Sequence, residues 1–158
     1  MAAYGVPDDL DGALPWSWAD TRLSASRNFW IVTASSAARP HAMPAWGVWI
    51  PALERFAFSC APQSRKARNL HANPQIVVAA DDTVECVSLE GRASEISGSE
   101  ADVFVDAYAR KYEDDPAKQA ALAAFMRENK IFEVTPERAF GIIEREDEFA
   151  QRATRWVW

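Results

Sequence analysis

The sequence predicts a single, mainly β domain: a small antiparallel barrel with added helices. About seven short runs rich in β-branched and aromatic residues follow one another, turn-like breaks separate them, and a helical pair comes late in the chain. The 158 residues match the usual size of one domain, and neither a repeat nor a long linker divides them. We therefore expect one domain over residues 1–158, with an extension at 1–20 and an aromatic tail at 154–158.

The first half of the chain predicts a short helix and three sequential antiparallel strands. Trp16 and Trp18 lead into the helix, whose apolar side includes Leu23. The three strands are expected at 29–34, 42–50 and 56–60, with breaks at 35–40 and 51–55. A second helix over 63–72 must end before Asn73, because the proline that follows disfavours helical geometry there.

The second half predicts four further strands and two helices. The strands are expected at 76–80, 85–96, 131–134 and 140–144. Residues 97–100, SGSE, fit a capping box, so the next helix is expected to begin there, with Val103, Phe104, Ala107 and Tyr108 on one face. Asp115 and Pro116 begin the second helix, with Leu122, Phe125 and Met126 inward.

Composition excludes several classes of partner. A net charge of −6 and a pI of about 4.9 argue against nucleic acid and anionic membranes, which basic surfaces usually bind. Cys60 and Cys86 lack metal-type spacing, so we expect reduced thiols. No apolar stretch is long enough for a membrane span, and the first residues do not resemble a signal peptide. These features predict a cytoplasmic protein.

The motifs of several enzyme classes are absent from the sequence. Its six glycines never cluster, which excludes a dinucleotide fingerprint and a P-loop. His41 and His71 lie too far apart for a helical metal pair, and no nucleophile elbow is present. We predict no metal site and name no catalytic residue.

The most informative segment is the basic turn at 59–70, SCAPQSRKARNL. Ser64 is expected to cap a helix whose first turn carries Arg65, Lys66 and Arg68. Cations at a helix N-terminus oppose its partial positive charge, at a cost of about 0.3–1 kcal/mol each. A phosphate bound at this helix start would offset the unfavourable interaction, since charge-assisted hydrogen bonds contribute about 1.5–3 kcal/mol each. The alternative is a solvated helix whose cations meet nearby acidic residues.

Several segments in order resemble one known family. They are FWIVT (29–33), RPHAMPAWGVW (39–49), SRKARNL (64–70) followed by NP (73–74), and EGRA (90–93). Together they resemble the pyridoxamine-phosphate-oxidase-like split β-barrel proteins, in particular the flavin/deazaflavin oxidoreductases of actinobacteria. The resemblance covers roughly residues 20–145 and implies an FMN-binding-protein-like antiparallel split barrel.

The resemblance also implies a cofactor, a partner and a set of contacts. It implies a homodimer with FMN or the deazaflavin coenzyme F420 at the subunit interface, and we favour the deazaflavin. In this arrangement Ser64, Arg65, Lys66 and Arg68 form the phosphate-binding turn, and Ser59, also assigned to the cofactor site, lies at the strand end that leads into it. The backbone at Met43, Pro44 and Ala45 lies against the ring, and Asn69 braces the turn. Trp46 is assigned to the cofactor too, although core or dimer packing explains it as well.

The C-terminus departs from the true pyridoxamine-phosphate oxidases. Their Arg-Leu-x-Pro ending is replaced by Arg155-Trp156-Val157-Trp158, so oxidation of vitamin B6 is not expected. Trp156 and Trp158 either cover the cofactor ring or seal the dimer, and we favour the second. His41 is either a donor to a ring carbonyl or a substrate, or a satisfied polar position, and we favour the second.

The expected function is an oxidoreductase that transfers a hydride between the cofactor and a small organic substrate. One alternative is a non-enzymatic flavin, deazaflavin or haem carrier of the same fold. Another is a barrel for an apolar ligand, without redox function.

Overall fold

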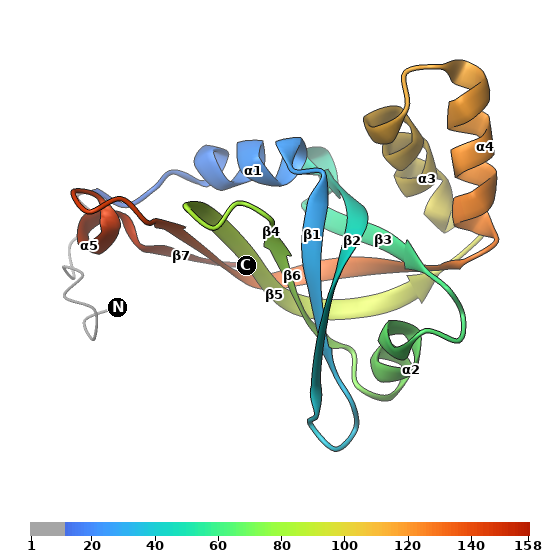
Figure 1. Cartoon of the computed structure of the whole chain (residues 1–158), viewed down its shortest axis with the longest axis horizontal. Helices are drawn as coiled ribbons and strands as arrows, with labels where there is room; N and C mark the ends of the chain where they lie inside the picture. The colour runs from blue at the N-terminus through green and yellow to red at the C-terminus, as the bar shows by residue number, and fades with distance from the viewer. Residues whose placement is uncertain (1–11) are drawn as a thin grey trace.

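Seven antiparallel strands form one sheet in the order β3-β2-β1-β4-β5-β6-β7, and an additional β3–β6 pairing closes six of them into a barrel (Figure 1). The computed structural model describes residues 12–158. The strands are β1 (Asn28–Ala34), β2 (Pro40–Ile50), β3 (Arg55–Cys60), β4 (Gln75–Ala80), β5 (Glu85–Ile96), β6 (Lys130–Ile143) and β7 (Thr154–Val157). The predicted fold class, an antiparallel barrel with added helices, is confirmed.

The two predicted strands at 131–134 and 140–144 are one continuous strand, β6. Opposite it, the register shifts between Glu90, which faces Arg138, and Gly91, which faces Pro136. A side chain at Gly91 would meet the Thr135 carbonyl oxygen at 2.1 Å, so the close approach requires glycine. The bulge accommodates Pro136, which lies in the gap between the two predicted strands.

Strand β2 changes its partner along its length. Gly47–Ile50 pair with β3, whereas residues 40–46 pair with β1 alone among the described strands. Pro44 lies within this open edge, where its missing N–H costs no ladder hydrogen bond. The β1–β2 hairpin therefore extends beyond the closed part of the barrel, with one backbone edge free of a neighbouring strand (Figure 1).

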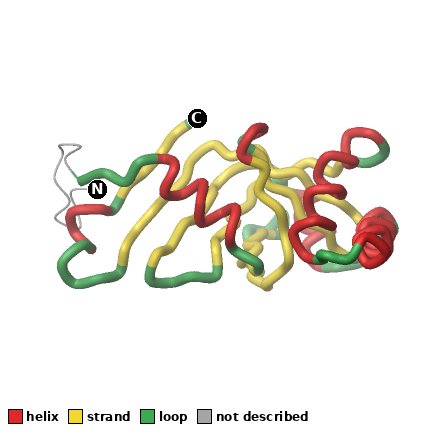
Figure 2. Tube along the Cα trace, turned by 90° about the horizontal axis from the view of Figure 1, so that it is seen from above, coloured by secondary structure: helices red, strands yellow, loops and turns green. Residues whose placement is uncertain are grey.

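The helices cover different parts of the barrel. They are α1 (Trp16–Ala25), α2 (Arg65–Ala72), α3 (Ser99–Tyr112), α4 (Pro116–Arg127) and α5 (Phe149–Arg152), with a 3-10 turn at Pro51–Leu53. Helix α1 runs along the barrel, while α3 and α4 lie side by side at one end (Figures 1 and 2). No helix within residues 12–158 is long and apolar enough to span a membrane.

Two apolar clusters hold these parts together. The barrel interior contains Phe29, Ile31, Phe56 and Phe58, all without exposed surface. The second cluster joins α3 and α4 to the outside of β2, β3 and β6, and its buried members include Phe104, Met126, Val48, Ala57 and Ile131. The helical pair is thus a layer that packs on the outside of the barrel.

The predicted start and inward faces of α3 and α4 need correction. Gly98, at φ 57°, is the N-cap of α3, and no side chain caps the helix, so the predicted capping box is wrong. Val103 and Phe125 are 46% and 58% exposed, because α3 packs through Phe104, Val105 and Tyr108 and α4 through Met126. Apolar residues at neighbouring positions, such as Val103 beside Phe104 and Phe125 beside Met126, point in different directions around a helix, so only one of each pair faces the core.

The aromatic tail forms a strand of the sheet. Thr154–Val157 pair with residues 138–141 of β6. The rings of Trp156 and Trp158 lie 5.5 and 4.9 Å from that of Trp16 in α1, both edge to face, and the Trp158 indole donates to Glu54. The tail therefore joins α1 to the barrel within one chain.

Candidate functional site

The cationic turn (residues 59–69) leads from the end of β3 into α2. Ser64 caps the helix as predicted: its hydroxyl accepts a hydrogen bond from the Ala67 N–H at 3.1 Å. The next helical hydrogen bond runs from the Arg68 N–H to the Ser64 carbonyl. Within residues 12–158, the backbone N–H groups of Arg65 and Lys66 have no acceptor. Two donors at the helix start are therefore available to a ligand.

The basic side chains of this turn lack acidic partners. Arg65 and Arg68 are exposed and Lys66 is half-buried. None of the three forms an ion pair with a carboxylate in the described part of the chain, although other basic residues do. Arg68 instead donates to the Gln63 carbonyl. The alternative interpretation, a surface helix whose cations meet nearby acids, is not what the described residues show.

The hairpin brings a histidine and a polar anchor beside the turn. His41 pairs across the strands with buried Thr33, so it lies on the inner face. Partial burial first, and then Arg65 and Lys66, lower the pKa of His41. The Asn69 amide, which is also buried, donates to the Thr33 hydroxyl at 2.9 Å. This buried hydrogen bond fixes α2 against β1.

The four residues assigned to the ring lie on both faces of β2. Met43 and Ala45 share the inner face with Ile31 and Phe29, their cross-strand neighbours. Met43 is nevertheless 47% exposed, because β3 does not continue beside this part of β2. Pro44 and Trp46 face outward, and Trp46 stacks on Tyr112 of α3, with ring centroids 4.6 Å apart. A flat ligand on the inner face would contact Met43 and Ala45 but not Trp46 of the same chain.

Ser59 and Cys60 occupy the end of β3, where both are half-buried and paired with β6. Burial raises the pKa of the Cys60 thiol, although Ser64 and Lys66 act in the opposite direction. The thiol therefore lacks the lowered pKa of a reactive cysteine. No group of acidic, histidine and cysteine residues in the described part of the chain is arranged to hold a metal ion.

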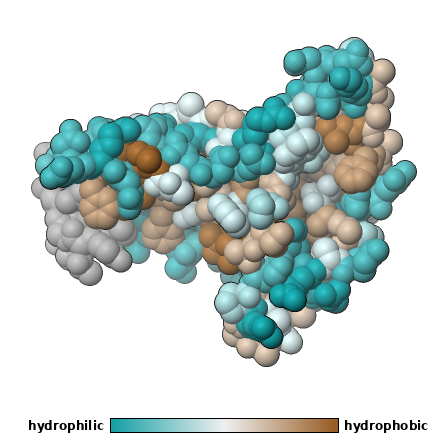
Figure 3. Space-filling model, viewed as in Figure 1, coloured by the Kyte–Doolittle hydropathy of each residue, from teal (hydrophilic) through white to brown (hydrophobic). Residues whose placement is uncertain are grey.

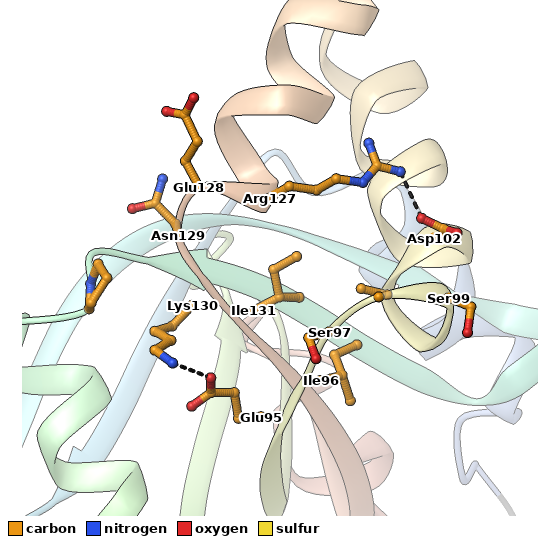
Figure 4. Close-up of a pocket in the computed structure, with 13 residues that line it drawn as sticks. Glu95, Ile96, Ser97, Ser99, Asp102, Arg127, Glu128, Asn129, Lys130 and Ile131 are labelled. Carbon is orange, nitrogen blue, oxygen red and sulfur yellow. Dashed lines mark hydrogen bonds and ion pairs between the residues drawn. The ribbon is translucent and has the colours of Figure 1, made fainter.

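Two hollows border the cationic turn. The larger, of about 560 Å³, lies between the β5–α3 connection and the α4–β6 connection (Figure 4). Its charged side chains neutralise one another: Arg127 contacts Asp102 at 2.8 Å, and Lys130 contacts Glu95 at 2.5 Å. Glu95 also accepts from His71, at 2.7 Å. This hollow therefore offers no surplus of positive charge.

The smaller hollow has the opposite electrostatic character. It measures about 270 Å³ and is called here the basic hollow; it is lined by Ser35, Arg39, Pro40, Arg65, Arg68 and Asn69. The lower lobe of the molecule, which the hairpin tip and α2 form, shows hydrophilic residues beside paler and weakly hydrophobic ones (Figure 3). Arg39 was missed by the sequence-based prediction, because its proximity to α2 depends on the long-range packing of the hairpin.

Three features describe the class of protein to which this chain belongs: a closed antiparallel barrel, a hairpin with an open backbone edge, and a helix that begins with three cations. Comparison with family models matches residues 19–142 to the family described as pyridoxamine 5'-phosphate oxidase, so the chain belongs to that family. The predicted resemblance is confirmed. No curated protein sequence matches this chain.

Solved structures with a similar fold have diverse names. A conserved hypothetical protein of Mycobacterium tuberculosis is 18% identical, with a TM-score of 0.69 over 85% of this chain and 88% of that one. An F420 reductase is 19% identical, with a TM-score of 0.56 over 76% and 94%. The haem storage protein HutZ of Vibrio cholerae is 18% identical, with a TM-score of 0.56 over 77% and 87%. At these identities the likeness concerns the fold.

Proposed function

We propose that this chain is an oxidoreductase that binds the phosphate of FMN or of the deazaflavin coenzyme F420 at the cationic turn. One observation carries the proposal: within residues 12–158, Arg65, Lys66 and Arg68 have no carboxylate partner, and the first two N–H groups of the helix that they begin have no acceptor. The arrangement is unfavourable alone and favourable with an anion.

The charges and donors fit a phosphate group. A phosphate monoester carries a charge of about −1.5 to −2 near neutral pH and three acceptor oxygens. The N–H groups of Arg65 and Lys66 supply directional donors, and the ammonium of Lys66, a half-buried residue, supplies positive charge. Ser64 is already engaged with Ala67, so its hydroxyl serves mainly to hold the turn.

The open edge of β2 is suited to the ring. Met43 and Ala45 provide an apolar wall on its inner face, next to His41 and the turn. The backbone of residues 40–46 has an edge without a strand partner in the described chain. When bound, the ring supplies the hydride chemistry, and the protein contributes orientation and exclusion of water. This division of labour is consistent with the absence of an acid–base pair from the predicted site.

Family membership supports a flavin-type cofactor, and the neighbouring F420 reductase supports the deazaflavin. The haem storage protein among the neighbours keeps a carrier function as the second candidate. We propose a small organic molecule as the hydride partner. A carrier would bind the cofactor equally well but would not turn it over with any acceptor.

We also propose that the protein is a homodimer. Trp30 and Pro44 are directly opposite each other on the outward faces of β1 and β2, and Trp30 is 45% exposed. Val32 and Val77 continue this apolar strip on β1 and β4. A second copy covering the strip would bury surface that is otherwise costly to hydrate.

A parallel titration with FMN and F420 tests the cofactor proposal. Lys66→Ala is expected to weaken the affinity of the preferred cofactor about tenfold or more, which is about 1.4 kcal/mol. Lys118→Ala is the matched control, since Lys118 lies exposed on α4. Equal affinities in both variants would contradict the phosphate site. Haem absorption with no flavin binding would favour the carrier, and turnover of reduced cofactor would favour the enzyme.

A further inference from the structure

The turn carries more positive charge than one phosphate needs. Arg65, Lys66 and Arg68 together with Arg39 of the hairpin place four cations around the basic hollow and the helix start. A single phosphate has a charge of about −1.5 to −2, so two of the four cations remain uncompensated. The whole chain has a net charge of −6, which makes this local excess a specific feature of the site.

The basic hollow has walls that are fixed by hydrogen bonds. On the hairpin, the Ser35 N–H donates to the Arg39 carbonyl at 3.0 Å, and the Arg39 N–H donates to the Ser35 hydroxyl at 3.2 Å. Ala38 adopts φ 57° to close this turn, a conformation that alanine rarely takes. On α2, the Asn69–Thr33 hydrogen bond fixes the opposite wall to β1. Both walls are thus anchored to the same strand.

The lining of the basic hollow includes no carboxylate. Three arginines, two small polar groups and a proline form it, and none of the arginines has an acidic partner within residues 12–158. The larger hollow differs in this respect, because each Arg or Lys that lines it forms an ion pair with a carboxylate. Arg68 uses one guanidinium nitrogen on the Gln63 carbonyl, which leaves further N–H donors for a ligand.

We propose that the basic hollow is a second anion subsite, which binds a further phosphate or carboxylate of the same ligand. Arg39 and Arg68 hold this second group and Arg65 lies between the two anions. Guanidinium groups suit the role because they bind phosphate and carboxylate through paired hydrogen bonds. The inference rests on the proposed function for the first phosphate. It implies that the natural ligand carries more anionic groups than FMN does.

Calorimetric titration of the full chain with inorganic phosphate, tripolyphosphate and citrate tests the subsite. Tripolyphosphate is expected to bind at least about tenfold more tightly than phosphate. Arg39→Gln should weaken tripolyphosphate at least about fivefold and phosphate less than about twofold. Arg68→Gln should weaken both, because Arg68 also belongs to the cationic turn. Citrate is the carboxylate probe: tight citrate binding with weak tripolyphosphate binding would assign the subsite to carboxylates.

Arg110→Gln removes the same charge from an exposed position on α3 and serves as the control. Equal weakening by Arg110→Gln and Arg39→Gln would overturn the proposal, because it would indicate a diffuse field. No preference of the wild type for tripolyphosphate or citrate over phosphate would overturn it too. If Arg39→Gln does not fold, Arg39→Lys carries the test, because lysine keeps the charge but lacks the paired donors of a guanidinium. Titration of the same samples with FMN and with F420 separates the two proposals: failure of both cofactors to bind, with an intact tripolyphosphate response, rejects only the proposed function.

Discussion

His41 links the proposed phosphate site to pH. Partial burial and the cations Arg65 and Lys66 lower its pKa, so the free protein holds a neutral imidazole near pH 7. A bound anion offsets the two cations, which raises the pKa of His41 and causes proton uptake on binding. Affinity should therefore increase as the pH falls through the pKa of the liganded state.

Comparison with His41→Gln isolates this effect, because ionisation of the FMN phosphate, with a pKa of about 6, affects both proteins alike. We expect the affinity of wild type relative to the variant to fall about threefold to tenfold between about pH 5.5 and pH 7.5. Fluorescence titration across this range measures it. If the affinities of wild type and His41→Gln depend on pH in the same way, the bound anion does not change the pKa of His41.

Part of the site was predictable from single residues. A capping serine followed by three cations is a local contradiction that an anion resolves, and it can be recognised in seven consecutive letters. Arg39 carries no such local signal. Its role depends on the turn at Ala38, whose positive φ the sequence does not indicate, and on the packing of α2 against β1.

Among the elements, the strands were predicted closely and the outer helices less well. Alternation of side chains fixes the face of a strand. In α3 the buried residues do follow the helical period, from Ala101 to Tyr112, but Val103 lies beside that stripe, and α4 is rich in alanine and buries only Met126. The tail strand β7 was not predicted. Among the described strands its four residues pair only with β6, and helix α5 and a turn separate the two strands in the sequence. The bulge opposite Pro136 likewise arises from pairing with β5.

Tyr112 fixes α3 to the point where the open edge of β2 ends. Its hydroxyl accepts from the Gly47 N–H at 2.9 Å and lies 2.5 Å from the Arg27 carbonyl. Tyr112→Phe removes the hydroxyl that bonds the Gly47 N–H and the Arg27 carbonyl. We expect a loss of about 1–2 kcal/mol in the free energy of unfolding. Urea denaturation measures the change.

Tyr108→Phe is the matched control for this prediction. Tyr108 is also buried on α3, but its hydroxyl makes no hydrogen bond to any other described residue. Removal of the Tyr108 hydroxyl should change the free energy of unfolding by less than about 0.5 kcal/mol. Similar losses in the two variants would show that ring packing, and not the hydroxyl of Tyr112, holds the helix.

At the scale of the whole molecule, the apolar strip on β1, β2 and β4 predicts association of two copies. Trp30→Asp places a charge in the middle of the strip and should convert a dimer to a monomer in light scattering after size-exclusion chromatography. Phe125→Asp, at a position 58% exposed on α4, should leave the dimer intact. A monomeric wild type, or a dimer unaffected by Trp30→Asp, would contradict this assignment.

The account depends on recognition of a phosphate by the start of α2, and the affinity of FMN relative to riboflavin measures it most directly. The two molecules share the same ring and differ in the phosphate. We predict that the wild type binds FMN at least about tenfold more tightly than riboflavin, and that Lys66→Ala removes most of this difference. Equal binding of FMN and riboflavin by the wild type, with no effect of Lys66→Ala, would contradict the proposed site.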